Sequence, residues 1–125
     1  MGVKIFSRGF YVSRILCTGN AGFIGSHIVE GLLNQGHTVI GTDDLSGGFL
    51  ENLPTHKSLN FHKFRFYKQD ICDRGAMEEI FMGHKPEVVV HLAANARESA
   101  SFYDLYRVTR ANLYMSSALI ELAIK

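Results

Sequence analysis

The chain has 125 residues, 46% of them hydrophobic, which is enough for one domain with its own core. A formal net charge of +1 argues against a nucleic-acid-binding or membrane-surface protein, and no apolar run reaches the ~18 residues of a membrane span. Cys17 and Cys72 lack CxxC spacing, so they are expected to be structural thiols in a reducing compartment, which predicts a cytoplasmic protein.

The first half of the chain alternates strand and helix patterns. Residues 15–18 form a short apolar run closed by glycine, which predicts a strand. Over residues 23–35 apolar side chains recur every three or four positions, so we expect an amphipathic helix with Gly36 as its left-handed cap. A second strand is expected over residues 37–42, followed by a polar loop over 43–60.

Residues 61–70, FHKFRFYKQD, alternate aromatic and basic side chains. Such alternation occurs on surfaces that stack single-stranded nucleic acid, but a half-exposed edge strand explains it more simply and is preferred here. Asp73 is then expected to cap a helix that ends near residue 83, residues 87–92 to form a buried strand, and residues 104–124 a last helix. The order β-α-β-loop-β-α-β-α predicts an α/β fold with a parallel sheet.

The segment TGNAGFIGSH joins the first strand to the first helix and contains three glycines. Gly19 allows a positive φ directly after the strand, Gly22 removes a side chain where a pyrophosphate would approach, and Gly25 lets the helix pack against the sheet. Glycine-rich turns also occur for packing alone. The Gly-Lys-Ser/Thr ending of a triphosphate-binding loop is missing from this one.

Residues beside this turn have the properties of a dinucleotide site. The amides near Phe23 and Ile24 lie at the positive end of the helix dipole, where they can bind an anion. Asp43 follows the second strand, where a carboxylate can bind an adenosine ribose and repel a 2′-phosphate. Because no Lys or Arg follows Asp43 before Lys57, the pattern favours NAD over NADP. Taken alone, an aspartate at this position is more often an ordinary turn residue, but together with the three glycines it favours a cofactor site.

The same motifs occur in order with VIGTDDLSGG, QDICD and VVVHLAANAR, and with Asn112 in the last helix. From about Arg14 to Lys125 the chain resembles the extended short-chain dehydrogenase/reductase family of NAD-dependent epimerases and dehydratases, in particular nucleotide-sugar enzymes similar to UDP-glucose 4-epimerase. The resemblance implies the N-terminal half of a Rossmann-type doubly wound parallel sheet, truncated after its fourth strand and the following helix. Residues 1–13 would be a short basic extension and residues 14–125 a partial NAD-binding domain without the substrate-binding part.

The resemblance also implies which residues bind NAD. These positions are Gly19, Gly22, Phe23, Ile24, Gly25, Asp43, Asp70, Ile71, Leu92, Ala93 and Ala94. Asp70 and Ile71 would flank the adenine, and the last three would line the cofactor further along. Asp70 is alternatively a helix-entry residue, and the two alanines are alternatively small packing residues.

Two further polar residues fall in the matching segments. Asn112 is expected on the apolar side of its helix, where it would need buried partners and would make either a structural hydrogen bond or a ligand contact. His91 is interpreted as a hydrogen-bonded histidine at the end of a buried strand. No HExxH motif or clustered His/Cys spacing suggests a metal site.

The family's acid/base pair, a tyrosine followed four residues later by a lysine, does not occur in this chain. No catalytic residue is therefore assigned, and the chain alone is expected to be inactive. In the intact enzyme the resemblance implies oxidation of a sugar hydroxyl through NAD, followed by reduction or dehydration of the keto-sugar. The alternatives are a non-catalytic dinucleotide-binding or interaction module and a non-functional truncated product.

The expected partners are NAD and, in the intact enzyme only, a nucleotide sugar. In a sheet of order 3-2-1-4-5-6, a chain that ends after the fourth strand leaves residues 87–92 at an open edge. We therefore expect self-association through this edge, or a homodimer when the protein is complete.

Overall fold

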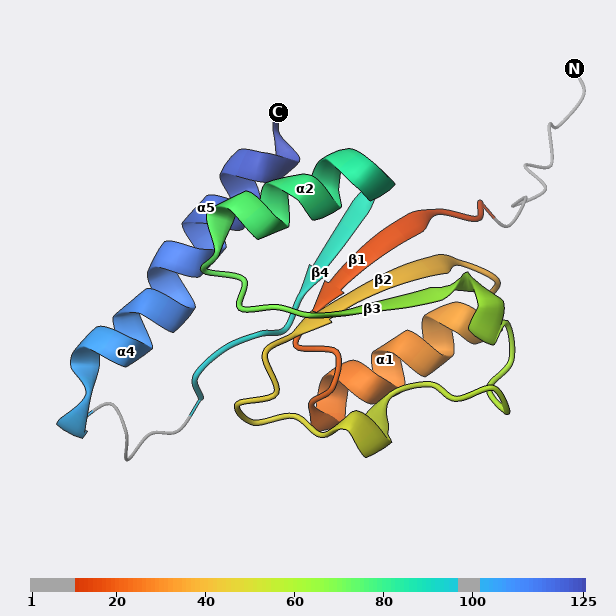
Figure 1. Cartoon of the computed structure of the whole chain (residues 1–125), viewed down its shortest axis with the longest axis horizontal. Helices are drawn as coiled ribbons and strands as arrows, with labels where there is room; N and C mark the ends of the chain where they lie inside the picture. The colour runs from red at the N-terminus through yellow and green to blue at the C-terminus, as the bar shows by residue number, and fades with distance from the viewer. Residues whose placement is uncertain (1–10, 97–101) are drawn as a thin grey trace, which may run out of the picture.

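A parallel sheet forms the centre of the computed structural model, which describes residues 11–96 and 102–125 (Figure 1). Its strands lie in the order β3-β2-β1-β4, with bounds β1 Arg14–Thr18, β2 Thr38–Asp43, β3 Phe64–Lys68 and β4 Val88–His91. The helices are α1 Phe23–Asn34, α2 Arg74–His84, α4 Leu105–Thr109 and α5 Met115–Ala123. Two 3-10 turns, η1 Leu50–Asn52 and η2 Phe61–Lys63, precede β3, and a π-helical turn, η3 Arg110–Tyr114, joins α4 to α5. The predicted first half of a doubly wound α/β sheet is confirmed.

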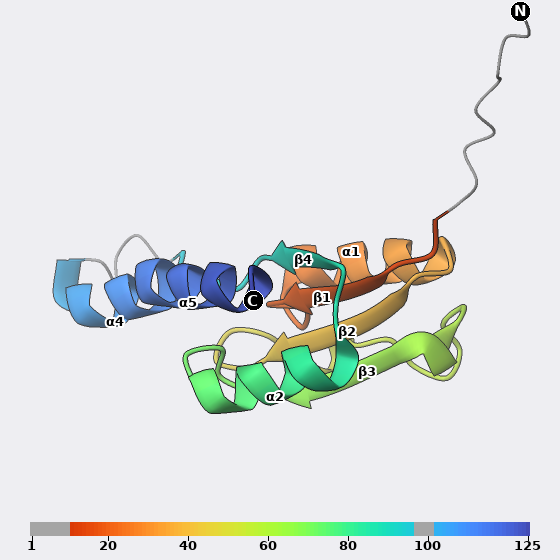
Figure 2. The ribbon, with the colours of Figure 1, turned by 90° about the horizontal axis from the view of Figure 1, so that it is seen from above.

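The helices lie on both faces of the sheet, and Figure 2 shows α1 and α2 on opposite sides of it. Alternate residues of β1 and β2 enter two separate cores because side chains of a strand point to opposite faces. The core beneath α1 consists of Cys17, Val29, Leu33, Val39 and Phe64. The core beneath α2 and α5 consists of Leu16, Ile40, Ile71, Met77, Ile80, Met115, Leu119 and Leu122. None of the helices in the described ranges is long and apolar enough to cross a membrane.

The segment of alternating aromatic and basic residues contains the expected edge strand, but the strand is shorter than predicted. Its first three residues form η2, and only residues 64–68 pair with β2. Lys63 donates from Nζ to the carbonyl of Gly36 at 2.9 Å, and Arg65 donates to the carbonyls of His62 and Phe64. These cations are therefore engaged with backbone carbonyls, which weakens the nucleic-acid alternative further.

Helix boundaries follow the predicted caps. Gly36 has φ +87 directly after α1, and the Asp73 side chain accepts from the Ala76 amide at 3.1 Å to cap α2. At the other end of the sheet, Asn60 donates from Nδ2 to the carbonyl of Leu33 at 2.7 Å. The loop after β2 is thus tied to the C-terminal end of α1.

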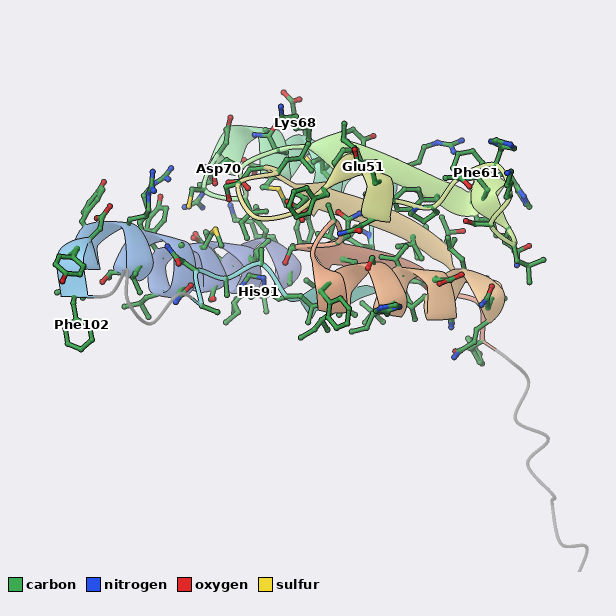
Figure 3. All side chains as sticks on the ribbon, turned by 90° about the horizontal axis from the view of Figure 1, so that it is seen from below. Glu51, Phe61, Lys68, Asp70, His91 and Phe102 are labelled. Carbon is green, nitrogen blue, oxygen red and sulfur yellow. The ribbon has the colours of Figure 1, made fainter. Side chains whose placement is uncertain are left out.

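The last helix differs from the prediction. One helix was expected over residues 104–124, but Leu105 at the start of α4 is 69% exposed, and α4 extends away from the sheet (Figure 1). Phe102, just before α4, is 87% exposed and lies at the end of this helical segment that is farthest from the sheet (Figure 3). The π-helical turn η3 inserts an extra residue into the helical repeat, so the apolar face of α5 does not continue into α4.

Strand β4 is also less buried than its apolar sequence suggests. Val88 is 44% exposed, while Val89 and Val90 are half-buried. Within the described residues β4 pairs with β1 alone. Its second edge is therefore open, and an apolar sequence typical of a central strand lies at the border of the sheet.

The first turn of helix α1 packs directly against Gly19 and Asn20 of the preceding turn. A Cβ atom at Gly25 would collide with the carbonyl oxygen of Gly19 and lie 2.8 Å from Cα of Asn20. The expected reason for this glycine, helix-to-sheet packing, is therefore wrong in detail, because the close neighbour is the turn and not a strand. Gly31, in the same helix, has no atom within 4 Å of the corresponding position.

The two glycines of α1 should respond oppositely to a methyl group. We expect Gly25→Ala to lower the free energy of unfolding by about 1–3 kcal/mol because the backbone of the turn cannot yield easily. Gly31→Ala should raise it by about 0.5–1 kcal/mol because alanine favours the helix and meets nothing. Urea unfolding followed by circular dichroism measures both. Equal effects of the two changes would contradict the contact between Gly25 and the turn.

Candidate cofactor-binding site

The glycine turn lies where three strand ends meet. Gly19 has φ +70, and its amide donates to the carbonyl of Thr42 at 2.8 Å. A Cβ atom at Gly19 would lie 2.6 Å from the amide nitrogen of Ala93 and 2.8 Å from the carbonyl carbon of Leu92. The residue is therefore required to be glycine both by its backbone conformation and by the approach of the segment that follows β4.

The N-terminal end of α1 faces outward with its amides free of side-chain caps. Gly22 is the N-cap residue, no side chain accepts from the first turn, and no acidic residue lies in that turn. Because the first amides of any helix lack helical partners, this end can receive an anion. The side chains of Phe23 and Ile24 do not belong to the core, since these residues are 79% and 64% exposed.

Asp43 is the last residue of β2 and is buried, with 8% of its surface exposed. Its Oδ2 accepts from the Ala21 amide at 2.9 Å, and its Oδ1 accepts from the Leu45 amide at 2.9 Å. The carboxylate therefore fixes the glycine turn as well as standing at the predicted ribose position. Each oxygen retains a second lone pair for a ligand hydroxyl.

Beneath the turn, Asn20 is fully buried, and neither its Nδ2 nor its Oδ1 has a hydrogen-bond partner. A Cβ at Gly41 would lie 2.5 Å from that Nδ2, so Gly41 provides the space that the Asn20 side chain occupies. This pairing of residues in the turn and in β2 was not apparent in the sequence.

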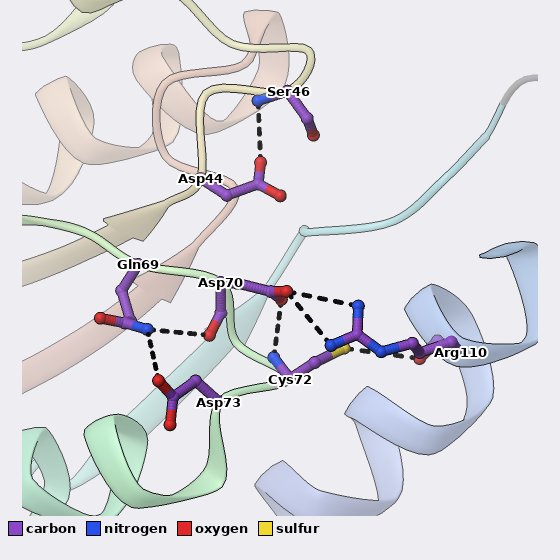
Figure 4. A network of polar contacts seen from close by, with 7 residues as sticks. All are labelled: Asp44, Ser46, Gln69, Asp70, Cys72, Asp73 and Arg110. Atoms are coloured by element: carbon purple, nitrogen blue, oxygen red, sulfur yellow. Dashed lines mark hydrogen bonds and ion pairs between the residues drawn. The ribbon is translucent and has the colours of Figure 1, made fainter.

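Asp70 lies after β3 in a polar network that reaches the C-terminal helix (Figure 4). Its Oδ1 accepts from the Cys72 amide at 2.8 Å, and its Oδ2 accepts from both Nη atoms of Arg110 at 3.3 Å. Burial, followed by the charge of Asp70, raises the pKa of the Cys72 thiol. Sequence analysis missed Arg110 because its partner is 40 residues away.

The remaining predicted cofactor-binding residues differ in how much of their surface is exposed. Ile71 is 4% exposed and belongs to the core beneath α2, so its side chain has little free surface for a ligand. Leu92 and Ala93 are half-buried against the glycine turn, and Ala94 is exposed. The structure thus brings the turn, Asp43 and residues 92–93 together.

Both cysteines are free thiols. Cys17 is fully buried in β1, and this burial, followed by the charge of Asp43, raises its pKa to about 12. Within residues 11–96 and 102–125, no group of three or more His, Cys, Asp or Glu side chains is arranged to hold a metal ion.

Asn112 lies in η3 and is exposed, which corrects the expectation that it lies on the apolar side of the helix. Its Oδ1 accepts from the Asn95 amide at 2.7 Å, and its Nδ2 donates to the Asn95 carbonyl at 3.0 Å. The displaced helical phase at η3 explains the exposure. Of the two roles left open, a structural hydrogen bond is the one observed, and it holds the segment after β4.

Comparisons with known proteins place these features in a family. Residues 15–125 match the model of the NAD dependent epimerase/dehydratase family. The UDP-glucose 4-epimerase of Mycolicibacterium smegmatis is 48% identical over 91 residues, which are 73% of this chain and 28% of that protein.

Solved structures show the same similarity. The Thermotoga maritima UDP-glucose 4-epimerase with UDP-glucose gives a TM-score of 0.81 at 43% identity, over 89% of this chain and 34% of that one. The Thermus thermophilus UDP-glucose 4-epimerase in complex with NAD gives 0.78 at 38% identity, over 87% and 33%. The chain spans about a third or less of the length of the proteins it matches.

The pair of hydrogen bonds from Asn112 should control the segment after β4. We expect Asn112→Ala to accelerate hydrogen exchange of the Asn95 amide by about fivefold, since one net hydrogen bond is worth ~1 kcal/mol. Asn34→Ala, an exposed asparagine at the end of α1, is the matched control and should leave Asn95 unchanged. An unchanged exchange rate in Asn112→Ala would show that this contact does not hold the segment.

Proposed function

Because the chain belongs to the NAD-dependent epimerase/dehydratase family, we propose that residues 14–125 bind the adenosine diphosphate half of NAD. The observation that carries the proposal is the meeting of three elements: the uncapped first turn of α1, Asp43 at the end of β2, and residues 92–93 against Gly19. A dinucleotide in an open parallel sheet binds across such strand ends, with its pyrophosphate at the helix N-terminus.

The residues present fit this cofactor. At Gly22 the only heavy atom near an added Cβ would be the Gly19 carbonyl oxygen at 3.3 Å, which leaves a surface without side chains beside the free amides. The pyrophosphate would be held at Gly19, Gly22, Phe23, Ile24 and Gly25. Asp43 would accept from the adenosine ribose. Asp70 and the backbone of Ile71 would flank the adenine, and Leu92, Ala93 and Ala94 would border the rest of the cofactor.

The larger protein is proposed to be a nucleotide-sugar epimerase or dehydratase of the cytoplasm. The similar structures carry UDP-glucose or NAD, which supports a nucleotide diphosphate sugar as the substrate class. Bound NAD would accept a hydride from the sugar carbon whose hydroxyl is oxidised. No tyrosine here has a lysine four residues later, so these 125 residues are proposed to supply cofactor binding without the acid/base pair.

Titration with both dinucleotides tests the site. We expect NAD to bind at least about tenfold more tightly than NADP, because Asp43 accepts from a ribose hydroxyl and repels a 2′-phosphate. Asp43→Ala should weaken NAD binding by about tenfold or more, since the carboxylate also holds the turn. The ratio of the NAD affinity to the NADP affinity should become smaller in this variant. Isothermal titration calorimetry measures all four affinities.

The matched control for this titration is Glu79→Ala, which removes an exposed carboxylate from α2. It should leave both affinities unchanged. Equal affinity of the unmodified chain for NAD and NADP would contradict the role of Asp43. Absence of binding to either nucleotide would contradict the proposed function itself.

We also propose that the chain associates with itself through the open edge of β4. An apolar strand edge without protective charge tends to recruit another strand. Size-exclusion chromatography with light scattering should give a mass above that of the monomer, rising with concentration. Val88→Lys should shift the protein toward monomer, whereas Val12→Lys, at an exposed valine before β1, should not. A monomer at every concentration would contradict this proposal.

A further inference from the structure

A continuous series of hydrogen bonds crosses the sheet at the carboxyl end of β1 and β4. Thr18 is fully buried, and its Oγ1 lies 3.2 Å from the amide nitrogens of both Leu92 and Ala93. The same Oγ1 is 2.7 Å from Nδ1 of His91. Nε2 of His91 is 3.0 Å from Oγ of Ser116 in α5.

The Thr18 end of this series favours an unprotonated Nδ1 on His91. A hydroxyl has one hydrogen to donate and two lone pairs to accept. The Ala93 amide donates to Oγ1 of Thr18, and the Leu92 amide is shared between this oxygen and the Thr18 carbonyl, which is 3.1 Å away. The Thr18 hydroxyl can donate its hydrogen to Nδ1 of His91, which then needs no proton.

The Ser116 end determines the other nitrogen independently. Oγ of Ser116 donates to the carbonyl of Asn112 at 2.6 Å, so its hydrogen is engaged there. It can only accept from Nε2 of His91, which must carry the proton. In neutral His91 the hydrogen therefore lies on Nε2, and the contacts of Thr18 are compatible with this tautomer.

We propose that His91 is a positioning residue that joins residues 92–93 and α5 to the end of β1 as the neutral Nε2–H tautomer, and that its protonation releases them. In the protonated ring Nδ1 also carries a hydrogen, so it can no longer accept the hydroxyl hydrogen of Thr18. The relevance of residues 92–93 to NAD rests on the proposed function. The hydrogen bonds of His91 to Thr18 and Ser116 do not depend on that function.

Within residues 11–96 and 102–125, the charged side chains of β1 and of the C-terminal helix are engaged in ion pairs away from His91. On β1 the charged residue is Arg14, at the opposite end of the strand, where it pairs with Glu87 beside β4. On the C-terminal helix Arg110 pairs with Asp70 and Glu121 pairs with Arg74. Burial is what lowers the pKa of His91 below its usual value.

The lowered pKa of His91 determines the direction in which pH shifts the release of residues 92–93 and α5. The open state is the one in which residues 92–93 and α5 have separated from the end of β1. In that state His91 regains a pKa of about 6.5 and binds a proton more readily than in the closed state. Opening is thus favoured as the pH falls below about 6.5, by about tenfold per pH unit until the lowered pKa of the closed state is reached.

Nitrogen-15 NMR of the histidine rings in the full chain is the first test and requires no variant. At neutral pH we expect His91 to show a protonated Nε2 and an unprotonated Nδ1, and to titrate below pH 6.5. A predominant Nδ1–H tautomer, an average of both tautomers, or titration at or above pH 6.5 would overturn the proposal.

Hydrogen exchange of the Leu92 and Ala93 amides, corrected for intrinsic rates, is the second test. Protection should fall about tenfold per pH unit below pH 6.5 in the unmodified chain, and this slope should disappear in His91→Gln. Ser116→Ala should reduce protection at neutral pH. Ser117→Ala, which removes the same kind of bond, to the Leu113 carbonyl, without touching His91, should not.

A slope that persists in His91→Gln, or equal effects of the two serine changes, would overturn the proposal. Neither measurement uses a nucleotide. A correct tautomer and slope together with failed NAD titrations would therefore refute the proposed function alone.

Discussion

The missing side chain at Gly19 allows the ends of β1, β2 and β4 to meet. A single Cβ there would overlap the backbone of Leu92 and Ala93, and the amide of the same residue is bonded to Thr42. Everything else in the site depends on this approach. The turn can then reach Asp43 through the Ala21 amide, and α1 can begin close enough that Gly25 must also lack a side chain.

Three carboxylates follow strands β2 and β3, and each accepts a hydrogen bond from at least one backbone amide. Asp43 accepts from Ala21 and Leu45, Asp44 accepts from Ser46 at 2.8 Å, and Asp70 accepts from Cys72. Of these three, Asp70 alone forms an ion pair within the described parts of the chain, the exposed pair with Arg110. An exposed pair of this kind contributes little to stability, so its effect is mainly to orient the Asp70 carboxylate beside the C-terminal helix.

The local part of the site could be predicted from sequence, because glycine spacing, helix phase and strand-end carboxylates are determined by neighbouring residues. Gly19 has the expected positive φ, and Asp43 ends β2. The contacts between distant segments could not be predicted. The pairing of Arg110 with Asp70, of Asn112 with Asn95, and of Asn20 with Gly41 depends on how packed elements meet, for which no periodic pattern exists. The burial of Ile71 and the π-helical turn η3 were missed for the same reason.

The two ends of α1 differ in the side chains that contact their backbone. At the C-terminal end, Lys63 and Asn60 from the segment before β3 donate to the carbonyls of Gly36 and Leu33. At the N-terminal end no acidic residue or capping side chain is present. A cation of the chain itself thus lies at the negative pole of the helix dipole, whereas the first turn at the positive pole carries no acidic side chain. The helix therefore has an electrostatic asymmetry that favours an anion at its first turn, and Lys63, which is far from that turn in the fold, helps to establish it.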